Sequence, residues 1–102
     1  RGKLDGIVER INELAEEYAA QGMKVGILAT RETRERYGIG EVLVLGGRTQ
    51  PAVMASNLFS ALREFDDRAV DIVLAEWVDT SNEGLAIMNR MVRAAGFNVI
   101  DV

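Results

Sequence analysis

The residues best suited to chemistry follow directly after three short apolar runs. Lys24–Ala29 is followed by Thr30, Glu41–Leu45 by Gly46, Gly47 and Arg48, and Val70–Ala75 by Glu76. Paired glycines let a ligand approach the backbone, an arginine binds anions, and a carboxylate can serve as a general acid or base. Parallel sheets bind ligands outside the carboxyl ends of their strands. We therefore predict that these five residues bind a small ligand. The alternatives are a plain glycine turn with an exposed arginine, and a carboxylate that caps a helix or forms a salt bridge.

Several common chemistries are excluded by composition. The sequence has no cysteine and no histidine, which removes disulfides, thiol nucleophiles, zinc motifs and the Ser-His-Asp arrangement. Gly38-Ile-Gly40 follows a helical turn and opens a strand, the reverse of the order in a dinucleotide fingerprint, and no phosphate-binding Gly-Lys-Ser/Thr loop is present. We expect no catalytic residue, no metal ligands and no bound cofactor in this chain, with a metal site built from carboxylates alone as the alternative that composition leaves open.

Size and charge further limit the kind of protein this chain can be. The chain has 102 residues, 48% hydrophobic and 27% charged, which suits one globular domain over 1–102. The net charge of −4 leaves no basic surface for phosphates, so direct nucleic-acid binding is not expected. No apolar run reaches the roughly 20 residues of a membrane helix. The lack of cysteine is compatible with the cytosol, so we expect a cytoplasmic protein. The start at Arg1, without an initiator Met, indicates a fragment of a longer protein.

The apolar spacing predicts helices and strands in strict alternation. The expected elements are a helix over Leu4–Gln21 ended by Gly22, a strand over Lys24–Ala29, a helical turn over Arg31–Tyr37, a strand over Glu41–Leu45, a helix from Pro51, a strand over Val70–Ala75, a helix from a Thr80–Glu83 capping box to Ala95, and a strand over Phe97–Val102. Such alternation favours right-handed crossovers. We predict an α/β, Rossmann-like, three-layer domain with about four mainly parallel strands and helices on both faces.

The last predicted helix is apolar around most of its circumference. Its polar stripe is narrow and carries Asn89, Arg90 and Arg93. We expect Met88 or Met91 to contact a neighbouring helix, a second domain or another copy of the chain, because methionine adapts to such contacts. Asn57 and Asn89 lie within helices, where asparagine is a poor helix former. Each is expected to bond a loop or a partner, or to face solvent.

Three sequence strings together resemble a known family. They are NLFSALREFD over 57–66, DIVLAE over 71–76 and GLAIMNRMVRAAG over 84–96, and Lys24–Ala29 fits the same pattern. The chain is similar, over essentially its whole length, to the C-terminal domain of the two-domain threonylcarbamoyl-AMP synthases. It departs from that family at Asn82-Glu83-Gly84, where the family often has more glycine, and at Trp77, where a small residue is expected. These departures argue against a glycine-dependent nucleotide contact there.

The resemblance implies a parent enzyme that uses ATP, L-threonine and bicarbonate to make threonylcarbamoyl-adenylate, for modification of adenosine 37 in tRNA. A YrdC-type catalytic domain would hold the ATP, threonine and magnesium, and a linker would join it to the present domain. Both the catalytic domain and the linker are absent from this chain. No catalytic residue can therefore be carried over. The family signature residues present here, without an assigned role, are Asn57, Arg63, Asp66, Asn89 and Arg90.

Three functions follow as expectations. The first is an accessory domain that packs on the catalytic domain and gates it, without catalysis of its own. The second is a sensor that binds a nucleotide or similar small ligand at the strand ends. The third is a homodimerisation module built on the last helix, with Met88 and Met91 at its interface.

Overall fold

The computed structural model describes residues 3–47, 49–76 and 98–101. Its elements are α1 (Lys3–Ala20), β1 (Val25–Ala29), the 3-10 helix η1 (Arg34–Arg36), β2 (Glu41–Val44), α2 (Pro51–Asp67), β3 (Ile72–Ala75) and β4 (Asn98–Asp101). Each lies where the sequence predicts it, with bounds that differ by at most two residues for α1 and the strands. The predicted helix that ends at Ala95 falls outside the described residues.

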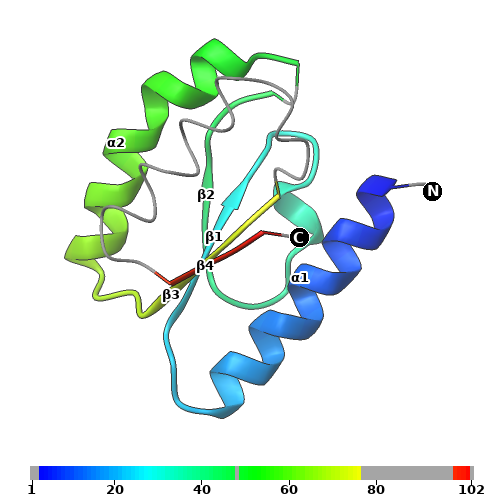
Figure 1. The fold of residues 1–102 in the computed structure, drawn as a ribbon, viewed down its shortest axis with the longest axis vertical. Helices are drawn as coiled ribbons and strands as arrows, with labels where there is room; N and C mark the ends of the chain where they lie inside the picture. The colour runs from blue at the N-terminus through cyan, green and yellow to red at the C-terminus, as the bar shows by residue number, and fades with distance from the viewer. Residues whose placement is uncertain (1–2, 48, 77–97, 102) are drawn as a thin grey trace.

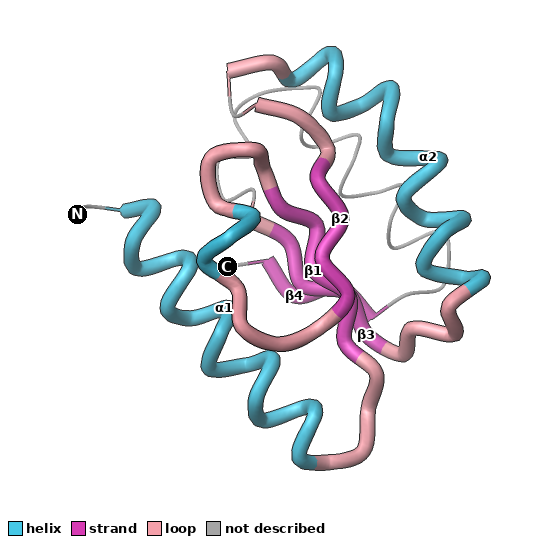
Figure 2. Tube along the Cα trace, turned by 180° about the vertical axis from the view of Figure 1, so that it is seen from behind, coloured by secondary structure: helices cyan, strands magenta, loops and turns pink. Residues whose placement is uncertain are grey.

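The strands form one parallel sheet in the order β2-β1-β3-β4. Figures 1 and 2 show α1 and α2 on opposite faces of this sheet. This confirms the predicted α/β, Rossmann-like architecture. From β1 the chain continues to β2 on one side of β1, and it then returns to β3 on the other side. The strand order therefore reverses between β1 and β3. In open parallel sheets such a reversal leaves a crevice at the carboxyl ends of the two strands.

The two central strands are buried on both faces. Their side chains alternate between a core under α2 and a core under α1. The first contains Leu28, Val73 and Ala75 with Leu58 and Phe65 of α2, and the second contains Ile27, Ile72 and Leu74 with Ile11 and Leu14 of α1. This explains why the strands read as continuous apolar runs without polar alternation.

Helix α1 turns its apolar side to the sheet and its carboxylates to solvent. Ile7, Ile11 and Leu14 are buried, whereas Glu9 and Glu16 are exposed. A helix with one apolar stripe is stabilised by burying that stripe. No helix in the described part of the chain has both the length and the apolarity to cross a membrane.

Gly26 of β1 permits close packing of α2 on the sheet. A Cβ at this position would lie 2.9 Å from Cε1 of Phe65 and 3.0 Å from Cγ1 of Val70. Cβ atoms do not approach other carbons so closely, so any larger residue would push α2 away from β1. The glycine in the Lys24–Ala29 run therefore serves helix–sheet packing.

Both long helices end in the same backbone motif. After α1, the amide of Met23 donates to the carbonyl of Tyr18 at 3.1 Å, and Gly22 adopts φ +85°. After α2, the amide of Val70 donates to the carbonyl of Phe65 at 3.0 Å, and Ala69 adopts φ 58°. This is the Schellman motif, in which a left-handed residue follows the helix. Glycine fits that conformation without strain, whereas alanine does not.

We expect Ala69→Gly to raise the free energy of unfolding by about 0.5–1 kcal/mol, because relief of left-handed strain exceeds the added entropy of the unfolded chain. Urea denaturation of the 102-residue chain measures it. The matched control is Ala19→Gly, at an exposed residue in the last turn of α1, where the same change should destabilise by up to about 1 kcal/mol. Equal losses at the two sites would contradict the strain argument.

Candidate functional site at the carboxyl ends of the strands

The structure brings four of the five predicted ligand-binding residues to one edge of the sheet. Thr30 directly follows β1 and Glu76 directly follows β3, on either side of the reversal in strand order. Gly46 and Gly47 follow β2 at the same edge. Arg48 lies outside the described residues. The prediction that these residues bind a ligand stays a prediction.

Glu76 places a buried carboxyl group beside the ends of β1 and β3. Its side chain is 1% exposed. The hydroxyl of Thr30 donates to Oε1 at 3.0 Å, while the hydroxyls of Thr33 and Tyr37 donate to Oε2. Thr30 and Thr33 are themselves buried. The protein's own hydroxyls therefore occupy positions around Glu76 that a ligand would need.

A buried carboxylate is stable only if hydrogen-bond donors replace the water that it loses. Removing a carboxylate from water is costly unless several donors replace the lost hydration. Hydroxyl donors on both oxygens of Glu76 meet that requirement with charge-assisted hydrogen bonds, which are stronger than neutral ones. Glu76 therefore holds Thr30, Thr33 and Tyr37 at fixed positions.

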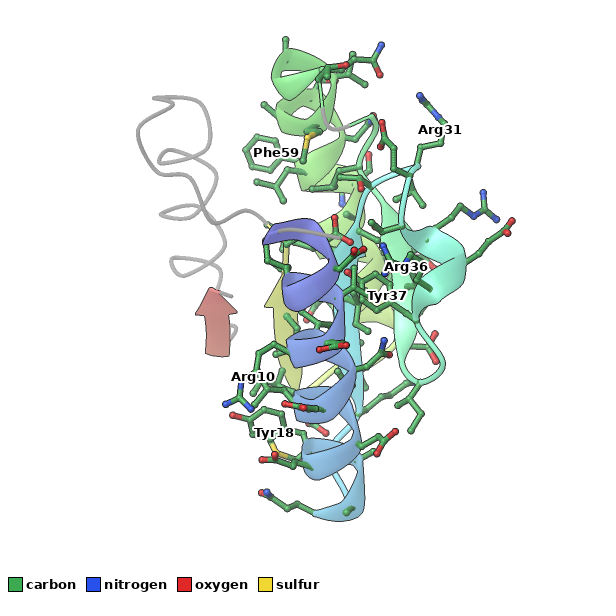
Figure 3. The ribbon with its side chains drawn as sticks, turned by 90° about the vertical axis from the view of Figure 1, so that its right-hand side faces the viewer. Arg10, Tyr18, Arg31, Arg36, Tyr37 and Phe59 are labelled. Carbon is green, nitrogen blue, oxygen red and sulfur yellow. The ribbon has the colours of Figure 1, made fainter. Side chains whose placement is uncertain are left out.

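Residues 30–38, which we call the η1 loop, are also attached to α1. The guanidinium of Arg36 lies 2.9 Å from Oδ1 of Asp5. The side-chain amide of Asn12 donates to the carbonyl of Arg36 at 3.1 Å and accepts from the amide of Gly38 at 3.3 Å. In Figure 3, Tyr37 lies toward the body of the protein. Arg31 is exposed, and its Nη1 lies 3.3 Å from the position that a Cβ on Gly47 would take. The loop is thus fixed on one side to β3 and on the other to α1.

The paired glycines make close contacts with the protein itself. The amide of Gly47 donates to Oε1 of Gln50 at 3.2 Å, and the carbonyl of Gly46 accepts from the amide of Arg31 at 2.9 Å. Gly46 adopts φ +151°, and a Cβ there would lie 3.1 Å from Cγ1 of Val53. The turn therefore connects the start of α2 to the η1 loop.

Two members of the Glu76 network escaped the sequence analysis. Thr33 and Tyr37 lie in the charged segment RETRERY over 31–37, which reads as a solvent-exposed turn. Besides these two, every residue in that segment is charged. Uncharged hydroxyl residues in such a segment are the signal that could have indicated an inward-facing side.

The family signature residues that the structure describes all lie on α2, outside the hydrogen-bond network of Glu76. Asn57 of α2 donates its side-chain amide to the carbonyl of Leu45 at 2.7 Å, so it bonds a loop, as one of the two expectations had it. Arg63 and Asp66 are exposed on α2. Asn89, Arg90 and the proposed interface residues Met88 and Met91 lie outside the described residues.

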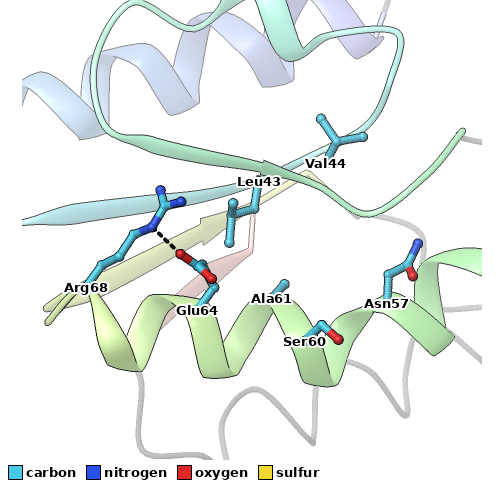
Figure 4. Close-up of a pocket in the computed structure, with 7 residues that line it drawn as sticks. All are labelled: Leu43, Val44, Asn57, Ser60, Ala61, Glu64 and Arg68. Carbon is cyan, nitrogen blue, oxygen red and sulfur yellow. Dashed lines mark hydrogen bonds and ion pairs between the residues drawn. The ribbon is translucent and has the colours of Figure 1, made fainter.

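An open pocket of about 470 Å³ lies between the edge strand β2 and α2 (Figure 4). It is lined by Leu43, Val44, Asn57, Ser60, Ala61, Glu64 and Arg68. The guanidinium of Arg68 bonds Glu64 at 2.7 Å and Glu41 at 2.8 Å. The hydrogen bond to Glu64, followed by that to Glu41, raises the pKa of Arg68 above its ordinary value. The single guanidinium of Arg68 thus offsets only part of the charge of these two carboxylates. In the described residues, no three acidic side chains lie close enough to hold a metal ion.

Comparison with known proteins identifies the family. Residues 4–96 match the family model described as the C-terminal domain of threonylcarbamoyl-AMP synthase. The chain belongs to this family. It is 43% identical over 96 residues to the threonylcarbamoyl-AMP synthase of Bacillus subtilis, and 38% identical over 101 residues to that of Pyrococcus abyssi. The matches cover 94% and 99% of this chain but 28% of each relative, so the chain spans about a quarter of their length.

A solved structure agrees with this assignment. The C-terminal Sua5 domain from Pyrococcus horikoshii is 35% identical to this chain, with a TM-score of 0.69 over 96% of this chain and 87% of that one. The resemblance seen in the NLFSALREFD and GLAIMNRMVRAAG strings is thereby confirmed. The chain is a domain of the threonylcarbamoyl-AMP synthase family.

We expect Thr33→Val to lower the free energy of unfolding by about 1.5–3 kcal/mol, because it removes a donor to a buried carboxylate while nearly keeping the side-chain shape. Thr49→Val, at an exposed threonine, is the matched control and should change it by less than about 0.5 kcal/mol. Urea denaturation of both variants decides the matter. Indistinguishable midpoints would mean that Glu76 does not depend on Thr33.

Proposed function

We propose that this chain is the non-catalytic accessory domain of a threonylcarbamoyl-AMP synthase. In this proposal the whole protein, in the cytoplasm, joins ATP, L-threonine and bicarbonate into threonylcarbamoyl-adenylate for the modification of adenosine 37 in tRNA. A YrdC-type catalytic domain of the same chain holds the ATP and Mg²⁺. The present domain packs on that catalytic domain and gates its nucleotide site.

The buried carboxylate of Glu76 is the observation that best supports an accessory role. In an open parallel sheet, the reversal in strand order is where a ligand usually binds. Here that place holds a side chain that is 1% exposed and accepts three hydroxyl hydrogen bonds. An ionised carboxylate would also repel the phosphates of a nucleotide. Supporting a neighbouring domain therefore suits this edge better than binding a nucleotide.

A domain that is rigid at this edge can gate a neighbour by contact. The η1 loop is fixed by Glu76 and by Asp5, so a partner resting on it meets a surface of defined shape. Pre-ordered surfaces bind without the entropy cost of ordering flexible loops. Such contact would hold the catalytic domain in the conformation that retains its nucleotide.

We expect deletion of residues 1–102 from the full-length enzyme to lower the rate of threonylcarbamoyl-adenylate formation, because the catalytic domain loses its support. The rate is measured with saturating ATP, L-threonine and bicarbonate. The control is the catalytic domain's thermal stability, which shows whether it remains folded. A folded catalytic domain with unchanged turnover would contradict the gating role.

Nucleotide binding at the glycine turn is the second candidate. It is favoured by the position of Gly47 between the start of α2 and the side chain of Arg31, whose Nη1 would lie 3.3 Å from a Cβ on Gly47. A phosphate at this turn would have to displace the amide of Gln50, which already accepts from Gly47. The accessory role requires no such displacement.

Titration of the 102-residue chain with ATP, AMP and threonine, followed by backbone amide shifts, separates the two candidates. The accessory role predicts no saturable shift near Thr30, Gly46, Gly47 or Glu76, because Glu76 and Gln50 already use the polar groups there. Saturable shifts confined to these four residues would favour the sensor instead. The domain would then have a ligand site of its own.

A further inference from the structure

We infer that the outward side of the η1 loop, formed by Arg31 and Arg34, is the surface on which this domain docks against carboxylates of the preceding part of its own polypeptide. This rests on the proposed function, since it assumes that a catalytic domain precedes residue 1. It deepens that function by assigning the face of contact and the chemistry of the partner.

The η1 loop is held by a buried carboxylate and by an ion pair. A buried carboxylate is an expensive means of fixing a loop, because apolar packing of similar volume is often equally or more stabilising. Yet Glu76 is buried with three hydroxyl donors, and Arg36 adds a further tie at 2.9 Å to Asp5. We take the role of these contacts to be that they fix the orientation of the residues between Thr30 and Arg36.

Those residues include arginines that pair with nothing in the described chain. Arg31 and Arg34 are exposed and form no ion pair or side-chain hydrogen bond there. Arg10, Arg36 and Arg68 each pair with a carboxylate of this domain. Arg63 is also exposed without such a partner among the described residues, but it lies on α2 and not on the η1 loop. Guanidinium groups on a rigid frame favour a partner that presents carboxylates, with which they form bidentate hydrogen bonds.

The η1 loop also lies beside the point where a polypeptide preceding residue 1 would enter the domain. Asp5, in the first turn of α1, contacts Arg36 directly. In Figure 1 the N-terminal end of α1 lies at the same edge of the sheet as the loop. A domain joined at residue 1 is therefore held close to this surface, and tethering raises the effective concentration of the contact.

The test uses the full-length enzyme with Arg31→Lys or Arg34→Lys, treated with a water-soluble carbodiimide. This reagent joins an amine to a carboxylate that it touches. We expect cross-linked peptides between position 31 or 34 and acidic residues that precede residue 1. Arg10→Lys is the matched control and should cross-link to Glu13 of its own helix, whose carboxylate lies 3.2 Å from Arg10.

A second measurement uses charge reversal. Arg31→Glu and Arg34→Glu should each lower the rate of adenylate formation about two- to fivefold, the effect of losing one exposed ion pair. They should leave the melting temperature unchanged, and Arg10→Glu should leave the rate unchanged.

Cross-links confined to residues 1–102 would overturn the docking surface. So would normal rates in both reversal variants of an enzyme that loses activity when the whole domain is deleted. Cross-links to the preceding part, in an enzyme whose turnover survives deletion of the domain, would instead uphold the surface and contradict the gating role. Reversal variants that weaken ATP binding without any interdomain cross-link would assign the arginines to phosphate, and would also overturn the inference.

Discussion

The carboxylate of Glu76 is buried, and three hydroxyl groups around it donate the hydrogen bonds that make its burial possible. It lies where the strand order reverses, between the ends of β1 and β3, and it reaches Thr30, Thr33 and Tyr37. If any donor were missing, a charged oxygen would remain incompletely solvated in the interior. The path of the chain after β1 is therefore determined by a side chain that lies some 40 residues further along the sequence.

This constraint links the three layers of the domain. The η1 loop that surrounds Glu76 continues to Asn12 and Asp5 of α1 on one face of the sheet. Through the amide of Arg31 it also contacts the glycine turn that leads into α2 on the other face. The edge that usually receives a ligand in this class of fold is thus built from contacts among the domain's own elements.

The sequence predicted the fold well because its elements depend on local patterns. Apolar spacing indicates where helices and strands lie, and Gly22 and Pro51 indicate where one helix ends and another begins. Both helices and all four strands of the described chain agree with these local signals. The grouping of Thr30, Gly46, Gly47 and Glu76 at one edge could also be predicted, because parallel strands bring their carboxyl ends together. The partners of Glu76 could not be predicted, because Thr33 and Tyr37 reach it across more than 35 residues through the folding of an irregular loop. Spacing along the chain carries no information about such a contact.

The topology also explains why a preceding domain would meet this edge rather than another. A helix that enters a parallel strand from the N-terminal side runs antiparallel to that strand, so α1 begins where β1 ends. Asp5, near the start of α1, therefore lies close enough to the loop after β1 to pair with Arg36. Any domain attached before α1 is therefore tethered at the carboxyl edge of the sheet, whatever its own fold. If the proposed accessory role holds, this domain supports its neighbour at that edge, which requires the edge to be rigid. The buried network around Glu76 supplies that rigidity.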